Sequence, residues 1–239
     1  MYTKCKDAIL LNGPIYNIKV PNGGSAGYKD IVINVTKSAS SFTEPGEQLK
    51  IVLDKVLRDS RLEILEVLEY GAGKLRNIPM VLRMDKSVCA VEFEELRINP
   101  IARENIRKSE KYGTKFRLLS PSEFFRDNRR FDLAMLINVV PDMPLISERI
   151  ELFEALKRKV KEEKYVLWFA QEEGDYRKIR EAGLNECLDG IWMGKGREFK
   201  TFYKYYPVYE VDRMMASYGF TLFRNFSVED NDARLYQKL

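Results

Sequence analysis

The stretch from Leu62 to Asn77 constrains the fold of this chain more than any other part of the sequence. It contains a short apolar run, Ile64 to Leu68, which leads directly into Glu69 and then into two glycines. A buried parallel strand that ends in a glycine turn has this pattern. Gly71 and Gly73 lack a Cβ, so the backbone can turn sharply there and a ligand can approach it closely.

The glycine spacing separates two kinds of cofactor site. A dinucleotide-binding fingerprint needs three glycines, G-x-G-x-x-G, and Arg76 stands at the third position. The remaining pattern, acid-x-Gly-x-Gly over residues 69–73, resembles the first motif of the class I S-adenosylmethionine-dependent methyltransferases. We expect a helix to begin near Lys74, where free backbone N–H groups would favour an anionic group. The resemblance implies that this loop holds the methionine half of the cofactor, through Glu69, Tyr70, Gly71, Ala72, Gly73 and Asn77.

Acidic and hydroxyl residues follow the next two expected strands. Residues 88–91 form an apolar strand that ends at Glu92, and this acid lies 23 residues after Glu69. Nucleotide sites of α/β proteins place a ribose-binding acid at about this spacing. The resemblance gives Glu92 that role, with Phe93 beside it. The third strand, residues 116–119, precedes Ser122 and Glu123, where the family commonly presents an acid or polar residue to adenine.

The stretch 131–142 has the pattern of a second long apolar strand with a polar break at its carboxyl end, where Asn138, Val139 and Asp142 stand. It resembles the fourth methyltransferase motif, whose terminal residues sit beside the methyl group. It is not the Asn-Pro-Pro-aromatic motif of amino-methylating DNA enzymes, because two valines fill the middle positions. Asp142 is the candidate general base, and the other interpretation of this residue is a helix cap.

The remaining pattern completes a fold prediction. Apolar strands alternate with amphipathic helices from residue 49 to residue 169, and a helix that ends at Gly219 is followed by two further strands. We therefore predict an α/β, three-layer Rossmann-like methyltransferase fold. Its sheet would be mostly parallel and seven-stranded, with an antiparallel last strand. We predict a β-rich N-terminal extension packed on the main domain (1–45), and a methyltransferase-like domain (46–239) with an insertion at 170–206.

The N-terminal region contains a hairpin signal, Asn12-Gly13, between two apolar runs. Pro14 would make the second strand of this hairpin a poor central one. In the bridge that follows, four hydroxyl residues are within reach of the expected cofactor site, although a loop and helix-cap role is the simpler interpretation: Ser38, Ser40, Ser41 and Thr43.

Composition narrows the chemistry. The chain has 239 residues, a net charge of +4 and no histidine. The absence of histidine removes Ser-His-Asp and Cys-His catalysis and nearly every zinc site, so we expect no metal. Three widely spaced cysteines indicate neither a disulfide framework nor a metal cluster. No run is long enough to span a membrane and no secretory signal is evident, so we expect a cytoplasmic protein without membrane partners.

The insertion is the expected acceptor-binding region, because segments outside a common fold usually determine substrate choice. Its candidate acceptor contacts are cationic or aromatic: Lys195, Arg197, Lys200 and Tyr203. Nucleic acid or a nucleotide-like acceptor is slightly favoured on these residues, while the aromatic-basic run 199–206 also fits an ordinary strand with solvated lysines.

Two other functional classes stay open. A nicotinamide-dependent oxidoreductase is disfavoured by the missing third glycine. A non-catalytic, cofactor-binding or partner-binding relative of the methyltransferases is the main alternative, because no catalytic residue is identified with certainty. A methyl transfer from a sulfonium needs mainly positioning of the nucleophile, which agrees with a chain without histidine.

Overall fold

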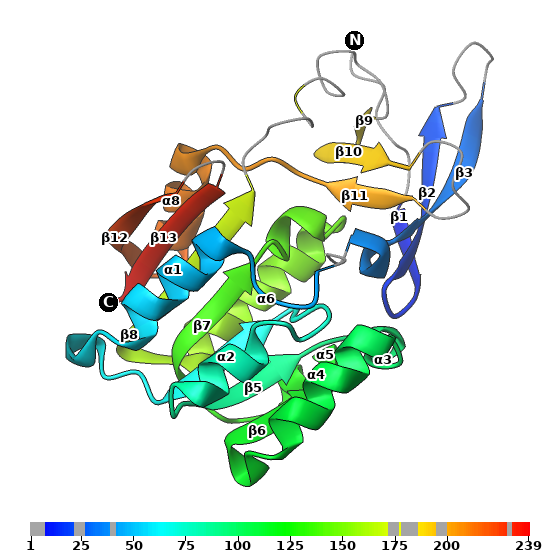
Figure 1. Cartoon of the computed structure of the whole chain (residues 1–239). Helices are drawn as coiled ribbons and strands as arrows, with labels where there is room; N and C mark the ends of the chain where they lie inside the picture. Colours follow the sequence, from blue (N-terminus) through cyan, green and yellow to red (C-terminus); the bar gives the residue numbers. More distant parts are fainter. Residues whose placement is uncertain are drawn as a thin grey trace.

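The computed structural model describes residues 8–21, 27–38, 42–171, 177, 186–194, 200–228 and 231–239. Its centre is a seven-stranded sheet (Figure 1). The strands lie in the order β12 (Phe220–Val228), β13 (Asn231–Lys238), β8 (Val160–Gln171), β7 (Phe131–Ile137), β4 (Glu66–Tyr70), β5 (Ser87–Val91) and β6 (Phe116–Leu119).

The last strand, β13, is the one that runs against the rest of this sheet. It pairs antiparallel with both β8 and β12, while β8, β7, β4, β5 and β6 are mutually parallel. The predicted mostly parallel sheet with an antiparallel last strand is confirmed. The order reverses beside β4, so the carboxyl ends of β4 and β7 border a crevice, which is where open α/β sheets bind ligands.

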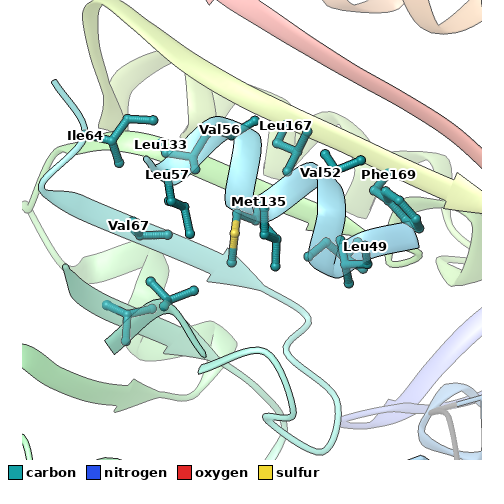
Figure 2. Close-up of a cluster of buried hydrophobic side chains, with 14 of the residues drawn as sticks. Leu49, Val52, Val56, Leu57, Ile64, Val67, Leu133, Met135, Leu167 and Phe169 are labelled. Atoms are coloured by element: carbon teal, nitrogen blue, oxygen red, sulfur yellow. The ribbon is translucent and has the colours of Figure 1, made fainter. Parts of the chain in front are cut away.

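Helices cover both faces of the sheet, as the alternation of apolar side chains requires. One face packs on α1 (Glu47–Leu57), α2 (Ile78–Arg83) and α4 (Pro100–Glu110), and the other on α5 (Pro121–Arg126), α6 (Ile146–Lys159) and α8 (Val208–Ser217). Along β7, Leu133 and Met135 face the first layer, while Ala134 and Leu136 face the second. Figure 2 shows the first of these cores, in which α1 lies across β4, β7 and β8. The predicted three-layer arrangement is confirmed.

The helix expected near Lys74 begins four residues later. Between β4 and α2 the backbone takes three left-handed residues, Gly71, Gly73 and Leu75, with φ of 69°, 58° and 55°. A right-handed helix cannot pass through such residues, so α2 starts at Ile78 with Pro79 in its first turn. The helix has only six residues.

The N-terminal region forms a three-stranded antiparallel sheet of β1 (Ala8–Asn12), β2 (Ile15–Pro21) and β3 (Tyr28–Asn34). The expectation that Pro14 would keep its strand from the centre is wrong. Pro14 lies in the turn between β1 and β2, where its missing N–H interrupts neither strand pairing and its carbonyl accepts a hydrogen bond from the Val35 N–H at 3.1 Å. β2 is the central strand. Ile31 and Ile33, which alternate with more exposed neighbours along β3, are buried.

The described part of the insertion contains a second small sheet, with β10 (Gly190–Met193) between β9 (Glu186–Cys187) and β11 (Thr201–Tyr203). This sheet lies beside the N-terminal sheet (Figure 1). The Asn34 N–H donates to the Lys200 carbonyl at 2.9 Å, and the Lys200 N–H donates to Val32 at 3.0 Å. Ile33, Trp192 and Phe202 share one buried cluster. The division of the chain into an extension (1–45) and a domain (46–239) stays a prediction.

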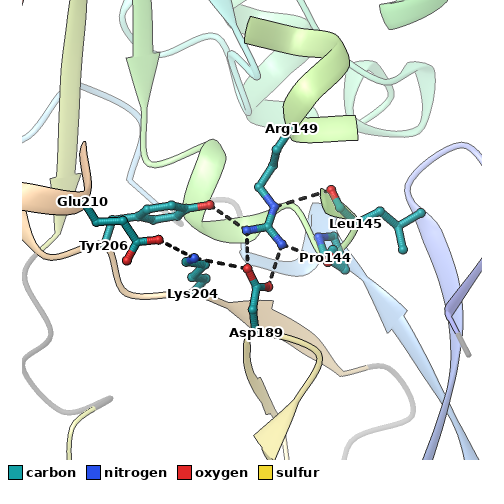
Figure 3. A network of polar contacts seen from close by, with 7 residues as sticks. All are labelled: Pro144, Leu145, Arg149, Asp189, Lys204, Tyr206 and Glu210. Carbon is teal, nitrogen blue, oxygen red and sulfur yellow. Dashed lines mark hydrogen bonds and ion pairs between the residues drawn. The ribbon is translucent and has the colours of Figure 1, made fainter. Parts of the chain in front are cut away.

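An ionic network around the buried side chain of Arg149 attaches the insertion to the helices that cover the main sheet (Figure 3). Arg149 of α6 donates to both carboxylate oxygens of Asp189, at 2.8 and 2.6 Å, and to the Tyr206 hydroxyl at 2.7 Å. Lys204 donates to Asp189 at 3.1 Å and to Glu210 of α8 at 2.6 Å. The arginine thus joins the turn before β10 to helices on the second face of the sheet.

The remaining short elements are α3 (Glu94–Arg97) and the 3₁₀ helices η1 (Val35–Ser38), η2 (Ser60–Leu62), η3 (Gly113–Lys115) and η4 (Val140–Asp142). Of these, η1 and η4 approach each other from the two sides of the crevice, because the Ser38 hydroxyl donates to the Asp142 carboxylate at 2.5 Å.

Candidate functional site

A cavity of about 1100 Å³ opens at the carboxyl ends of β4, β5 and β7. The glycine loop after β4 forms its floor, and the residues following β5 and β7 form two of its sides. The N-terminal region and the insertion complete it, through η1 and through Met193, Thr201 and Tyr203. Segments from five separate parts of the sequence therefore meet around one cavity, and residues of the insertion are among those that line it.

The glycine loop is fixed by its own hydrogen bonds. The N–H groups of Gly71 and Ala72 both donate to the Val91 carbonyl, at 3.0 and 3.1 Å. The Gly73 N–H donates to the Glu92 carboxylate. These three amides therefore bind the end of the neighbouring strand instead of pointing outward to an anion.

Gly71 is required by packing as well as by its backbone conformation. Its φ of 69° lies in the left-handed region, and a Cβ added there would stand 2.2 Å from Cγ2 of Val139. Val139 comes to this position because Asn138 is also left-handed, with φ of 54°, and because the Asn138 N–H donates to Phe169 at 2.8 Å. The loops after β4 and β7 thus interlock across the crevice.

Glu69 is the most deeply buried acid of the site, with 1% of its surface exposed. One carboxylate oxygen accepts a hydrogen bond from the Asn77 side-chain amide at 2.5 Å, and the other, Oε2, has no hydrogen-bond partner. The Asn77 side-chain oxygen also lacks a partner. Burial raises the pKa of Glu69 to about 7, although Asn77 and Arg76 act in the opposite direction. Two residues that line the cavity therefore each carry a buried acceptor atom without a donor.

Glu92 follows β5 and is also buried, with 4% of its surface exposed. Its carboxylate accepts hydrogen bonds from the Gly73 N–H and, at 2.8 Å, from the Phe93 N–H. Burial raises the pKa of Glu92 to about 7 despite these two bonds. The acid therefore connects the glycine loop to the end of β5, and it lines the cavity together with Phe93.

Asn138, Val139 and Asp142 follow β7 and line the same cavity. Asp142 is held by the Ser38 hydroxyl, and its removal from solvent raises the pKa of this carboxyl to about 7. The alternative interpretation of Asp142 as the cap of the next helix is not what the structure shows. Leu145 occupies the cap position of α6, and no side chain caps that end.

Of the two residues expected near adenine, Ser122 lines the cavity. The Glu123 carboxylate instead accepts a hydrogen bond from the Ser120 N–H at 2.6 Å, and the Glu123 N–H donates to the Ser120 hydroxyl at 3.3 Å. This reciprocal pair is a capping box at the start of α5. The side chain of Glu123 is thus engaged in holding its own helix.

The four candidate acceptor contacts divide into two groups. Lys195 and Arg197 lie outside the described residues. Two of the hydroxyl residues expected near the cofactor, Ser40 and Ser41, also lie outside them. Tyr203 is buried and lines the cavity. The Lys200 ammonium donates to the Gly194 carbonyl at 2.7 Å and lies 6.0 Å from the centre of the Trp192 ring.

Sequence reasoning missed one side of the cavity. Tyr16 of β2, Phe125 of α5, and Glu148 and Glu151 of α6 all line it. The Tyr16 hydroxyl contacts both oxygens of Glu148, at 3.0 and 2.9 Å, across 132 residues of sequence. No local pattern marks such a pair, because a buried tyrosine on a hairpin and an acid in the first turn of a helix are ordinary where they stand.

Within the described parts of the chain, no group of three or more His, Cys, Asp or Glu side chains could hold a metal ion. In the same parts, no helix is both long and apolar enough to cross a membrane. The two described cysteines, Cys89 and Cys187, are both buried.

The strand order, the antiparallel last strand and the crevice define the fold of the class I S-adenosylmethionine-dependent methyltransferases. A SAM-dependent methyltransferase from Methanosarcina mazei superimposes with a TM-score of 0.62 at 14% identity, over 82% of this chain and 99% of that one. Magnesium protoporphyrin IX methyltransferase from Synechocystis, with bound SAH, gives a TM-score of 0.57 at 12% identity, over 80% and 82%.

A third structure matches nearly the full length of both chains. It is 1,6-didemethyltoxoflavin-N1-methyltransferase from Burkholderia thailandensis, with bound 1,6-didemethyltoxoflavin and S-adenosylhomocysteine. Its TM-score is 0.55 at 12% identity, over 98% of this chain and 99% of that one. No protein-family model and no curated protein sequence matches the chain. At these identities the similarity establishes the fold.

Proposed function

We propose that this protein is a methyltransferase that uses S-adenosylmethionine. The observation that carries the proposal is the pair of buried, unpartnered acceptor atoms on Glu69 and Asn77, which line the cavity beside the glycine loop. A buried acceptor without a partner is costly, so a site that contains two of them is suited to a ligand that supplies donors. The ammonium group of S-adenosylmethionine supplies such donors together with a positive charge.

The other predicted contacts agree with this ligand. Glu92 would accept hydrogen bonds from the ribose, next to Phe93, and Ser122 would face the adenine, with Glu123 holding the helix that carries it. Tyr70, Gly71, Ala72 and Gly73 would border the methionine part, and Asn138 and Val139 the methyl group. When bound, S-adenosylmethionine supplies an activated methyl group. The residues of the chain then position the acceptor and exclude water, which accounts for much of the rate in this chemistry.

The structural neighbours support the proposal, because proteins of this fold include methyltransferases with bound SAH or S-adenosylhomocysteine. The acceptor is a separate question, since those two proteins are named for a porphyrin and a toxoflavin precursor. Two statements about the acceptor stay predictions from the sequence. One is that the acceptor is nucleotide-like, and the other is that it contacts four residues: Lys195, Arg197, Lys200 and Tyr203. A cytoplasmic location also stays a prediction.

The test compares Glu69→Gln with Glu66→Gln in binding S-adenosylmethionine by equilibrium dialysis. Glu66 begins the same strand at its exposed amino end, so it is a matched control. Glu69→Gln keeps the shape and the hydrogen bond to Asn77 but removes the negative charge. We expect it to weaken binding at least tenfold, because charged hydrogen bonds are worth about 1.5–3 kcal/mol. Equal affinity in the two variants, or no binding to the wild type, would contradict the proposal.

Catalysis is tested separately from binding. We expect release of S-adenosylhomocysteine from S-adenosylmethionine when a screen of metabolites, proteins and nucleic acids includes the acceptor. Tight binding of the cofactor without turnover in any fraction of that screen would favour the alternative function, a non-catalytic relative that retains the cofactor site.

A further inference from the structure

One wall of the cavity combines aromatic rings with carboxylates and has no role in the cofactor contacts proposed above, apart from Tyr70. We call it the acidic-aromatic wall. It consists of Tyr16, Tyr70, Phe125, Glu148 and Glu151, all of which line the cavity. The Tyr70 and Phe125 rings lie 6.4 Å apart, and Tyr16 contacts Glu148. The wall therefore contains residues from the N-terminal sheet, the end of β4, α5 and α6.

The charges of this wall are all negative. Glu148 and Glu151 are one turn apart on α6, and Glu151 raises the pKa of Glu148 in addition to the effect of burial. Both carboxylates also raise the pKa of Tyr70, after the larger effect of its burial. Asp142 lines the cavity close to the start of the same helix. Among the described lining residues, the cations lie elsewhere, with Lys37 on η1 and Lys74 and Arg76 on the glycine loop.

A second observation extends the negative character to the floor of the cavity. Glu69, 1% exposed, has an oxygen without a hydrogen-bond partner. Like charges that face one cavity repel each other, and a positive ligand relieves the repulsion. Tyrosine and phenylalanine faces attract a cation as well, most strongly where water is excluded. An anionic acceptor would meet repulsion from the same residues.

We propose that the acidic-aromatic wall selects a small organic amine as the methyl acceptor, so that the protein is an N-methyltransferase. This inference rests on the proposed function. The cavity of about 1100 Å³ must also contain the cofactor, which limits the acceptor to a small molecule or an exposed side chain. The ammonium form of the amine binds between the carboxylates and the aromatic rings. The amine must then lose one proton before its nitrogen can react.

The structure contains an acceptor for that proton. Asp142, with its pKa raised to about 7 by burial, lines the same cavity and is held by Ser38. A carboxylate of this basicity can take a proton at neutral pH. The neutral nitrogen then forms a bond to the methyl carbon with its lone pair while the carbon–sulfur bond breaks. The products are the methylated ammonium ion and S-adenosylhomocysteine, and the electron pair of the broken bond stays on sulfur.

The test measures binding of matched probes to the protein saturated with S-adenosylhomocysteine, by ligand-observed NMR titration. The probes share one ring and differ in charge: phenethylamine is cationic, 2-phenylethanol neutral and 3-phenylpropionate anionic. Adenosine monophosphate represents the nucleotide-like acceptor. We expect phenethylamine to bind at least tenfold more tightly than each of the others. The double variant Glu148→Gln/Glu151→Gln should lose that preference, while Glu154→Gln, an exposed acid on the same helix, should keep it.

Further variants separate charge from structure. Tyr16→Phe removes the hydrogen bond to Glu148 but keeps both charges and the ring, so it should retain more of the preference for the amine than the double glutamate variant does. If the double variant does not fold, Glu151→Gln is measured alone. Glu151 is exposed, and its substitution should reduce the preference for the amine severalfold. Tighter binding of adenosine monophosphate or the anion, or an amine preference that survives both glutamate substitutions, would overturn the inference. Failure of S-adenosylhomocysteine itself to bind, seen by calorimetry beforehand, would instead overturn the proposed function.

Discussion

The contact between Gly71 and Val139 provides a quantitative test of how the two loops interlock. Gly71→Ala adds a Cβ that would lie 2.2 Å from Val139 Cγ2 at a residue with φ of 69°. A non-glycine residue in the left-handed region costs about 1 kcal/mol. Forcing a methyl group into a packed contact costs about 1–3 kcal/mol more. We therefore expect Gly71→Ala to lower the free energy of unfolding by about 2–4 kcal/mol.

A double-mutant cycle separates the two contributions. Val139→Ala removes the methyl groups that the new Cβ would meet, so in that background Gly71→Ala should cost only the backbone strain, about 1 kcal/mol. Urea denaturation followed by circular dichroism measures all four variants. Gly46→Ala is the control, because Gly46 has φ of −61° and no atom within 4 Å of an added Cβ. An equal cost of Gly71→Ala in both backgrounds would refute the packing argument.

The same contact changes what a substitution at Gly71 can show about the cofactor. The sequence predicts that a β-branched residue at Gly71 abolishes binding without unfolding the chain. The structure shows that such a residue also collides with Val139. Binding by a Gly71 variant is therefore informative only where its stability has been measured, and Glu69→Gln is the cleaner test.

Three further predictions concern charges. Burial raises the pKa values of Glu69 and Glu92 to about 7 from the ordinary 4.5, so their contribution to stability is complete below pH 4.5 and is lost as pH rises through 7. The free energy of unfolding without cofactor should fall between pH 5 and pH 8 by up to roughly 3 kcal/mol per acid. Glu69→Gln should make this fall smaller, as measured by urea denaturation at each pH. Ser38→Ala should raise the pKa of Asp142 further, as measured by carboxyl carbon NMR, because the hydroxyl stabilises the carboxylate. Arg149→Met should lower the free energy of unfolding by roughly 1.5–3 kcal/mol, because it removes the charged hydrogen bonds to the partly exposed Asp189 and leaves that acid with Lys204 alone. Arg149→Met/Asp189→Leu should recover part of the loss in the same assay.

The central sheet was predictable because its signals are local. Residues 116–119 and 131–137 are strands within the predicted limits, since each is a mainly apolar run with one charged residue and polar residues beyond its carboxyl end. The acids Glu69 and Glu92 could be placed at strand ends for the same reason. The start of α2 could not be predicted from the sequence. The left-handed conformation of Leu75 depends on the packing of the whole loop, and a leucine gives no local signal for it.

The acceptor side of the cavity depends on contacts distant in sequence. Tyr16 meets Glu148, and Ser38 meets Asp142, across more than a hundred residues, so no spacing rule connects them. The sequence prediction favoured a nucleotide-like acceptor because the insertion contains cationic residues. The described wall of the cavity is acidic, which the sequence did not indicate, because Glu148 and Glu151 have the pattern of a solvated helix face.

Calorimetric titration of the wild-type protein with S-adenosylmethionine and, in parallel, with NAD tests the central claim most directly. The predicted result is saturable binding of one S-adenosylmethionine per chain, with S-adenosylhomocysteine competing for the same site and NAD giving no heat of binding. Saturable binding of NAD, or no binding of S-adenosylmethionine to a protein shown to be folded, would contradict the account.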